Sequence, residues 1–399
     1  LISANSNLLL LDSTGTVRIP YNVEEIASGV FNNLEGLTRV IIPGSVKKIG
    51  RNAFSNNKSL QEVIMEDGVE KIGTYAFWGC NNLTTVKMSN TVTEIDDQAF
   101  YNCSKLKNIN LSSSLTKING YVFSGCQSLD NIILPEGLNS LGIGLFDRCI
   151  SLKKINIPSS LKTISSGAFQ NCSSLVNIQV DSGNVYFTFD NGKLYNKDKD
   201  YLYFITKNSI DVNAKEITIE EGIKNISNGA LNFYTNAKTL NLPSTFQSIS
   251  YNIIPENIKE INISEGNLKY SSDGVNVYDD STSTLVVSVT KEKSTTVRNG
   301  TKIIGSSAFQ NCTNLENVTL NNDLEKIELQ AFWHTKLKNV YIPASVTYID
   351  PIAFYMLDLE SLEIDSANKN YTSDDKFVYN KNKTEIITYY KAESSVEIP

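Results

Sequence analysis

Phenylalanine returns at a constant spacing along the first half of this chain, and that spacing restricts the possible folds more than any other feature. Seven phenylalanines follow one another 23 residues apart: Phe31, Phe54, Phe77, Phe100, Phe123, Phe146 and Phe169. The spacing returns between Phe309 and Phe332, and Phe354 follows after 22 residues. A fixed period of roughly 20–50 residues is typical of repeat proteins, in which each repeat buries its apolar face by stacking on its neighbours. We therefore expect residues 1–399 to form a single continuous solenoid.

The repeat around residues 152–175 shows how one coil would be built. Ile155 and Ile157 alternate with Asn156, which predicts a short strand with one buried face. Pro158 would end that strand, because proline has no N–H to donate to a neighbouring strand. The equivalent segments are predicted to be parallel strands at 40–42, 63–65, 86–88, 109–111, 132–134, 155–157 and 178–180.

The rest of each repeat returns to the core twice more. Val46 and Ile49 form a second apolar segment after the strand. The pattern Ala168-Phe169-x-x-Cys172-x-x-Leu175 places apolar residues every three positions, which suggests a tight helical or 3-10 turn. The predicted class is α/β but mostly β: a solenoid of 23-residue coils with short strands and short helical or 3-10 turns.

The repeat resembles the BspA-like class of leucine-rich repeats over nearly all residues between about 17 and 364. One clear copy is Ile42-Pro43, Val46, Ile49-Gly50, Ala53-Phe54 and Leu60, in which Asn57 departs from the cysteine of the pattern. The resemblance implies a curved, right-handed solenoid on a secreted or surface-anchored, commonly bacterial protein. It also implies a role in adhesion or host-protein binding.

Three segments leave the period, near residues 181–213, 264–298 and 365–395, and they are similar to one another. The pattern Asn184-x-x-Phe187-x-x-Asp190 with a later Tyr195 returns from Asn267 and again from Asn368. Each pattern continues into a second run rich in β-branched and aromatic residues, after a turn of Asn, Asp, Ser and Lys. We interpret each segment as a β-hairpin inserted between coils, as BspA-like proteins often have.

The chain carries little that suggests catalysis. His334 is the only histidine, and Cys312 precedes it by 22 residues, about one coil. A cysteine nucleophile needs a lowered pKa and an oriented base, whereas Cys312 occupies a periodic inward position. We interpret both residues as structural and expect no enzyme activity.

The six cysteines point to packing rather than to disulfides or metal. Cys80, Cys103, Cys126, Cys149 and Cys172 are each 23 residues apart, so they should form one column along the solenoid. Stacked equivalents point the same way rather than toward each other, and no Cys-x-x-Cys spacing is present. We expect free, buried thiols, although disulfides are usual in secreted proteins. We predict no metal site and no cofactor.

The outward positions of the strands are the candidate binding residues. In a leucine-rich solenoid they lie side by side on the concave sheet, where polar side chains with scattered Ile and Tyr suit a protein or glycan surface. The predicted binding residues are Arg39, Ile41, Glu62, Ile64, Lys87, Asn108, Asn110, Ile133, Lys154, Asn156, Gln179 and Tyr341.

The sequence thus predicts a non-catalytic, secreted or cell-surface binding scaffold, an adhesin for an extracellular protein or glycan. The alternatives are a repeat region of a larger secreted enzyme and an architectural stalk. A net charge of −7 argues against a nucleic-acid partner, and no apolar run is long enough for membrane insertion. No signal peptide is recognisable, and the repeat pattern is cut at both ends, so we expect the chain to be part of a longer protein.

Overall fold

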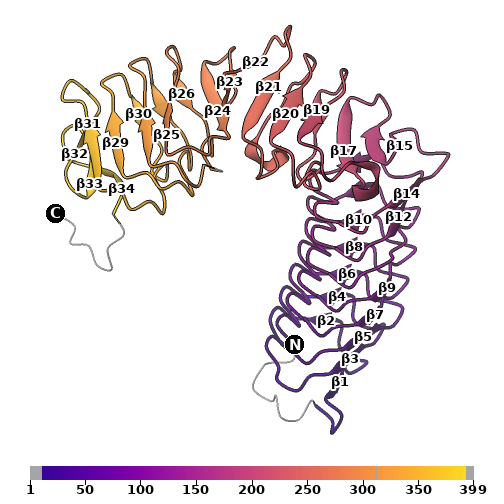
Figure 1. The fold of residues 1–399 in the computed structure, drawn as a ribbon. Coiled ribbons are helices and arrows are strands. Elements are labelled where there is room, and N and C mark those ends of the chain that lie inside the picture. The colour runs from indigo at the N-terminus through magenta and orange to yellow at the C-terminus, as the bar shows by residue number, and fades with distance from the viewer. Residues whose placement is uncertain (1–10, 311, 392–399) are drawn as a thin grey trace. The chain divides into compact units, whose positions relative to one another are not determined.

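The computed structural model describes residues 11–310 and 312–391, which separate into two compact units (Figure 1). Unit 1 holds the described residues up to 212 together with 226–233, and unit 2 holds 213–225 and those from 234 on. Both units are β-solenoids, as the periodic sequence predicts, and they contain almost no helix. A single continuous solenoid over residues 1–399 stays a prediction.

Most coils of unit 1 contribute two short strands, and equivalent strands of successive coils lie side by side (Figure 1). The first row is β1 (Thr16–Arg18), β3 (Arg39–Ile42), β5 (Glu62–Met65), β7 (Thr85–Lys87), β9 (Asn108–Asn110), β12 (Lys154–Ile157) and β14 (Asn177–Val180). The second row is β2 (Glu25–Ile26), β4 (Lys48–Ile49), β6 (Lys71–Ile72), β8 (Glu94–Ile95), β10 (Lys117–Ile118), β11 (Ser140–Leu141) and β13 (Thr163–Ile164).

Like packs on like because the pairing is parallel and shifted by one repeat. Val40 pairs with Val63, and Val63 pairs with Val86. The phenylalanines form one continuous stack with ring centroids 5.0–6.0 Å apart from Phe31 to Phe169. The 23-residue period therefore becomes a column of identical contacts, which is how a coil with no core of its own is stabilised.

The Ala-Phe segments are not helical, contrary to the sequence prediction. Only two short 3-10 helices are described, η2 (Lys207–Ser209) and η3 (Tyr251–Ile253). The backbone N–H of Phe54 donates to the carbonyl of Ala76 in the next coil at 2.8 Å. In addition, Asn52 and Asn56 adopt positive φ values of 54° and 57°. A helix needs consecutive right-handed residues bonded within one segment, so bonding between coils replaces it.

Three predicted strand positions also differ in the structure. β7 ends at Lys87, so Met88 of the predicted strand 86–88 lies outside it. β9 ends at Asn110, so Leu111 lies outside the strand and is only half-buried, whereas Ile109 is buried as predicted. Residues 132–134 form no strand, and a single parallel bridge joins Asn131 to Lys154. The ladder is therefore interrupted at the coil that carries Ile133.

The three insertions are antiparallel three-stranded sheets rather than simple hairpins. The first, in unit 1, comprises β15 (Phe187–Asp190), β16 (Lys193–Asn196) and β17 (Tyr201–Ile205). The second, in unit 2, comprises β22 (Tyr270–Ser272), β23 (Asn276–Asp279) and β24 (Thr284–Ser288). The third, also in unit 2, comprises β32 (Tyr371–Ser373), β33 (Phe377–Asn380) and β34 (Ile386–Tyr389). In the second insertion β24 also pairs in parallel with β26 of the next coil. That insertion is thus built into the solenoid. Residues 392–395 of the third lie outside the described residues.

Each insertion begins with an asparagine that fastens it to the preceding coil. Nδ2 of Asn184 donates to the carbonyls of Pro158 and Leu161 at 2.7 and 3.0 Å, and its Oδ1 accepts from the N–H groups of Tyr186 and Phe187. Asn267 and Asn368 make the equivalent four bonds in unit 2. The asparagine of the repeated motif is therefore structural.

The remaining strands of unit 2 repeat the two-row arrangement. They are β18 (Glu216–Thr218), β20 (Thr239–Leu242), β21 (Glu260–Ile263), β25 (Ser294–Thr296), β26 (Ile303–Ile304), β27 (Asn317–Thr319), β28 (Lys326–Ile327), β29 (Asn339–Ile342), β30 (Tyr348–Ile349) and β31 (Ser361–Ile364). β19 (Asn225–Ile226) lies where the two units divide the chain.

Candidate binding surface

The outward side chains of the first strand row form a surface that we call the strand face. Of the predicted binding residues in unit 1, Lys87, Asn108, Asn110, Ile133, Lys154 and Gln179 are exposed, and Arg39, Ile41, Glu62, Ile64 and Asn156 are half-buried. The alternation read from the sequence therefore separates core from surface, but not every outward side chain is free to meet a partner.

The N-terminal part of the strand face is occupied by its own ion pairs. Nε of Arg39 lies 2.9 Å from a carboxylate oxygen of Glu62, and the Lys87 ammonium lies 3.4 Å from the other oxygen. Beside them, Ile41 and Ile64 pair in register and half-bury each other. The side chains at this end of the strand face therefore already have contacts within the protein.

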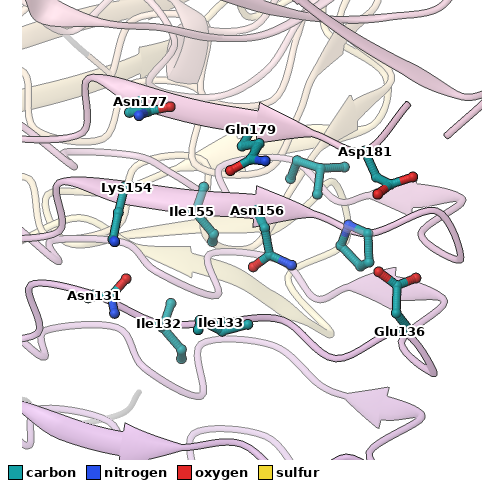
Figure 2. Close-up of a pocket in the computed structure, with 12 residues that line it drawn as sticks. Asn131, Ile132, Ile133, Glu136, Lys154, Ile155, Asn156, Asn177, Gln179 and Asp181 are labelled. Atoms are coloured by element: carbon teal, nitrogen blue, oxygen red, sulfur yellow. The ribbon is translucent and has the colours of Figure 1, made fainter. Parts of the chain in front are cut away.

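A depression of about 350 Å³ opens further along the strand face, where the ladder is interrupted. It brings together four predicted residues, Ile133, Lys154, Asn156 and Gln179 (Figure 2). They come from the coil that lacks a strand, from β12 and from β14, because residues 23 apart occupy equivalent positions in adjacent coils. Ile133 is 69% exposed, which is unusual for isoleucine in this solenoid.

The depression also contains residues that were not among the predicted binding set. Asn131 and Asn177 flank Lys154 in the neighbouring coils, at the start of the strands. Glu136 and Asp181 lie at the opposite end (Figure 2). The signal for Asp181 was in the sequence, since it occupies the position of Pro158 one repeat later. It was missed because it follows the predicted strand.

A second depression, of about 570 Å³, continues the first toward the insertion of unit 1. The two share Asn177, Gln179 and Asp181, and the second is closed by Thr188 of β15 and by Lys197. We call the two together the strand-face groove. The insertion thus extends the surface of β14 instead of interrupting it.

Asn156, another of the predicted binding residues, already has hydrogen-bond partners for its side chain. Its Nδ2 donates to the carbonyl of Leu134, and its Oδ1 accepts from the N–H of Leu134, both at 2.8 Å. The carboxamide thereby replaces the missing ladder bonds of 132–134. Asn156 is part of the wall that shapes the groove.

Tyr341 belongs to unit 2, on β29, and is not part of this groove. It is 51% exposed, and its hydroxyl donates to Oδ2 of Asp365 at 2.8 Å. That bond raises the pKa of Tyr341, and together with the Ala367 N–H it lowers the pKa of Asp365. Tyr341 therefore remains a separate candidate contact.

Cys312 and His334, the two residues that could have suggested catalysis, differ in burial. Cys312 is fully buried, and burial raises its pKa to about 11. His334 is exposed, and its ring lies 4.1 Å from that of Trp333. Within residues 11–310 and 312–391, no group of three His, Cys, Asp or Glu side chains is arranged to hold a metal ion. The same residues include no helix with the length and apolarity needed to cross a membrane.

The cysteine column lies in the core as predicted. All six cysteines are buried, and Sγ of Cys80 donates to the carbonyl of Phe54 in the preceding coil at 3.1 Å. Asn57, which departs from the cysteine pattern, bonds the equivalent carbonyl of Phe31 at 2.8 Å. Either side chain can therefore supply a donor to the preceding coil at this position.

We expect the native thiols to react slowly with a thiol reagent, because burial raises the pKa of Cys80 to about 12 and leaves little nucleophilic thiolate. Labelling followed by mass spectrometry checks this, with exposed Ser113→Cys as the positive control. Unfolding should make all six thiols reactive. An intact disulfide, or labelling of native Cys312 as fast as the control, would contradict the expectation.

The comparison with known families agrees with this architecture. The profile of the BspA type leucine rich repeat region (6 copies) matches residues 11–129, 93–210, 208–277 and 287–396. The chain belongs to the BspA-type leucine-rich repeat family. The match confirms the resemblance to this family that the repeat motifs indicate. No curated protein sequence is similar enough to count as a match.

Solved structures show the same fold at low sequence identity. A leucine rich cell surface protein from Faecalibacterium prausnitzii A2-165 is 24% identical, with a TM-score of 0.50, over 88% of this chain and 81% of that protein. A leucine-rich repeat protein from Eubacterium ventriosum ATCC 27560 is also 24% identical, with a TM-score of 0.52, over 75% and 83%. At this identity the similarity establishes the fold of the BspA-type chain alone.

Proposed function

We propose that this chain is a non-catalytic binding scaffold of a secreted or cell-surface protein, and that it recognises an extracellular protein or glycan through the strand-face groove. The observation that carries the proposal is the groove itself. It is a depression on the outer side of the strand row, lined by exposed polar side chains and by Ile133, which is 69% exposed. Such a surface suits a partner that brings both hydrogen-bonding groups and some apolar area.

The location is part of the proposal and rests on family and fold. A solved structure with the same fold is described as a leucine rich cell surface protein. A scaffold role is consistent with this repeat family. Its coils are stabilised by stacking on their neighbours, and the fold by itself does not imply catalysis.

A matched pair of variants in one coil tests the binding site. Ile133→Arg places a charge in the groove, whereas Ile150→Arg places the same charge at a site 44% exposed and outside the groove lining. Both proteins would be applied to arrays of extracellular proteins and glycans. We expect Ile133→Arg to weaken the captured interaction by about tenfold or more, and Ile150→Arg to leave it unchanged. Equal effects of the two variants, or no captured partner, would contradict the proposal.

His334→Ala should leave any binding activity of the chain unchanged, because His334 belongs to unit 2 and is not among the residues that line the groove. Turnover assays with glycosidase and peptidase substrates complete the test. A hydrolytic activity that disappears with this substitution would contradict the non-catalytic function.

A further inference from the structure

The strand-face groove contains carboxamides that have no partner within the protein. Asn131, Asn177 and Gln179 are exposed, and their side chains form no hydrogen bond with any other described residue. They lie around Lys154, which likewise forms no ion pair with a described residue. A surface carboxamide offers both donors and an acceptor, so these groups can bind a ligand that presents both in alternation.

We propose that the groove binds an extended polypeptide segment through its main chain. The proposal rests on the binding role proposed above and specifies its partner. It starts from Asn156, whose side chain already binds a peptide group in this groove. That carboxamide donates to the carbonyl and accepts from the N–H of Leu134, both at 2.8 Å. One strand offers its neighbour the same pair of groups.

The spacing of the free carboxamides fits the same kind of ligand. Asn177 and Gln179 are two residues apart on β14 and project on one face. Alternate residues of a strand are about 6.6 Å apart, and an extended ligand running along β14 has the same repeat. Its main-chain groups could therefore meet both carboxamides at once. Because each main-chain bond is independent of the ligand's side chains, this contact would supply affinity more than sequence selectivity.

Charge differs between the two ends of the groove and would set the ligand's direction. Lys154 pairs in register with Asn177, at the start of β12 and β14. Asp181 follows the end of β14, and Glu136 lies at the same end (Figure 2). Asp181 receives one bond, from the N–H of Gly183 to Oδ1 at 2.8 Å, and Glu136 receives one from Ser159 to Oε2 at 3.0 Å. Each carboxylate thus keeps an oxygen for a ligand.

The expected ligand therefore carries an acidic residue near Lys154 and a basic residue near Asp181. Asp181 is four positions after Asn177, which corresponds to about 13 Å of extended chain. The two charged residues of the ligand should be about four positions apart. Ile133, exposed beside them, would contact an apolar side chain between the charges. No aromatic ring lines the part of the groove around Lys154, where a sugar has no flat apolar face to stack on, whereas Phe187 and Phe189 line the part beside the insertion.

Selection of linear octapeptides from a random phage-displayed library, using the whole chain, tests the proposal. We expect enriched peptides to carry acidic and basic residues about four positions apart. Fluorescence anisotropy of a selected peptide would then be measured against the chain and its variants. Gln179→Leu and Lys154→Ala should each raise Kd by about tenfold. The exposed residues Gln61 and Lys162 lie outside the groove, and Gln61→Leu and Lys162→Ala should change Kd less than about twofold.

A main-chain probe separates this proposal from ordinary side-chain recognition. N-methylation of alternate peptide nitrogens in the selected peptide removes the donors that face the groove and keeps every side chain. We expect one alternating set to raise Kd by about tenfold or more and the other set to have a smaller effect. Equal binding of both methylated peptides and the parent would overturn the proposal, as would a library that yields no peptide dependent on Gln179 and Lys154.

A glycan array with the same variants distinguishes failure of the peptide proposal from failure of the binding function proposed above. An oligosaccharide whose binding is lost in Gln179→Leu but kept in Gln61→Leu would support the groove as a binding site and overturn the peptide proposal. Absence of both peptide and glycan binding at the groove would overturn both proposals. Peptide binding with the expected dependence on the main chain would support both.

Discussion

Replacing Asn184 by alanine should lower the free energy of unfolding by about 3–5 kcal/mol, because it removes a buried carboxamide that makes four hydrogen bonds to the backbone. The Asn184 side chain is 4% exposed and makes four hydrogen bonds. Two of them satisfy carbonyls of the preceding coil, and two satisfy N–H groups at the start of the insertion. An unsatisfied buried group typically costs about 1–3 kcal/mol. Not all four groups lose every partner, because the Pro158 carbonyl also accepts from the N–H of Leu161 at 3.1 Å.

Chemical denaturation followed by circular dichroism measures this loss. Asn108→Ala is the matched control, since Asn108 is an exposed asparagine on β9 of the same unit. The control should change stability by less than about 0.5 kcal/mol. If Asn184→Ala and Asn108→Ala were equally mild, the four-bond carboxamide would not be what fastens the insertion to the coil.

Replacing Phe100 by alanine should cost about 3–5 kcal/mol, because the phenyl ring fills the centre of the core and its loss leaves a cavity. Phe100 is fully buried and lies between Phe77 and Phe123, with ring centroids 5.1 and 5.8 Å away. Since each coil touches only its neighbours, the loss should be local. Hydrogen exchange is expected to show faster opening of the coils around residue 100 than of those around residues 309–354.

One substitution at the end of β9 and one just after it provide the scale for that experiment. Asn110→Ala removes an exposed side chain and should cost under about 0.5 kcal/mol. Leu111→Ala should cost less than Phe100→Ala, because Leu111 is only half-buried. Faster exchange spread evenly over both units after Phe100→Ala would contradict the nearest-neighbour picture.

The fold of each unit was predictable because the same residue pattern occurs many times along the chain. Val40, Val63 and Val86 each resemble a generic buried position, but their spacing of 23 residues indicates that they stack. The same spacing placed Cys80 in a buried column and Ile109 in the core. An error in interpreting one copy is corrected by the others, which a single globular domain does not allow.

The candidate groove was only partly predictable from the sequence. The strand pattern identified Lys154 and Gln179 as outward residues, and the structure brings them together. The pattern also identified Asn156, whose carboxamide turns out to bond Leu134. Nothing in the local sequence shows that residues 132–134 fail to form a strand, because Ile132 and Leu134 alternate as the other copies do and both are buried.

The sequence by itself determined the period, the inward and outward positions and the places where insertions interrupt the coils, since each depends on residue type at fixed spacing. Tertiary structure alone decided where the backbone bonds go. The Phe54 N–H donates to the carbonyl of Ala76 in the next coil, so a segment with helical spacing forms turns instead. Tertiary structure also decided that the strand ladder is interrupted beside Asn131, where the groove lies. Both outcomes depend on partners about one repeat away, which no local pattern specifies.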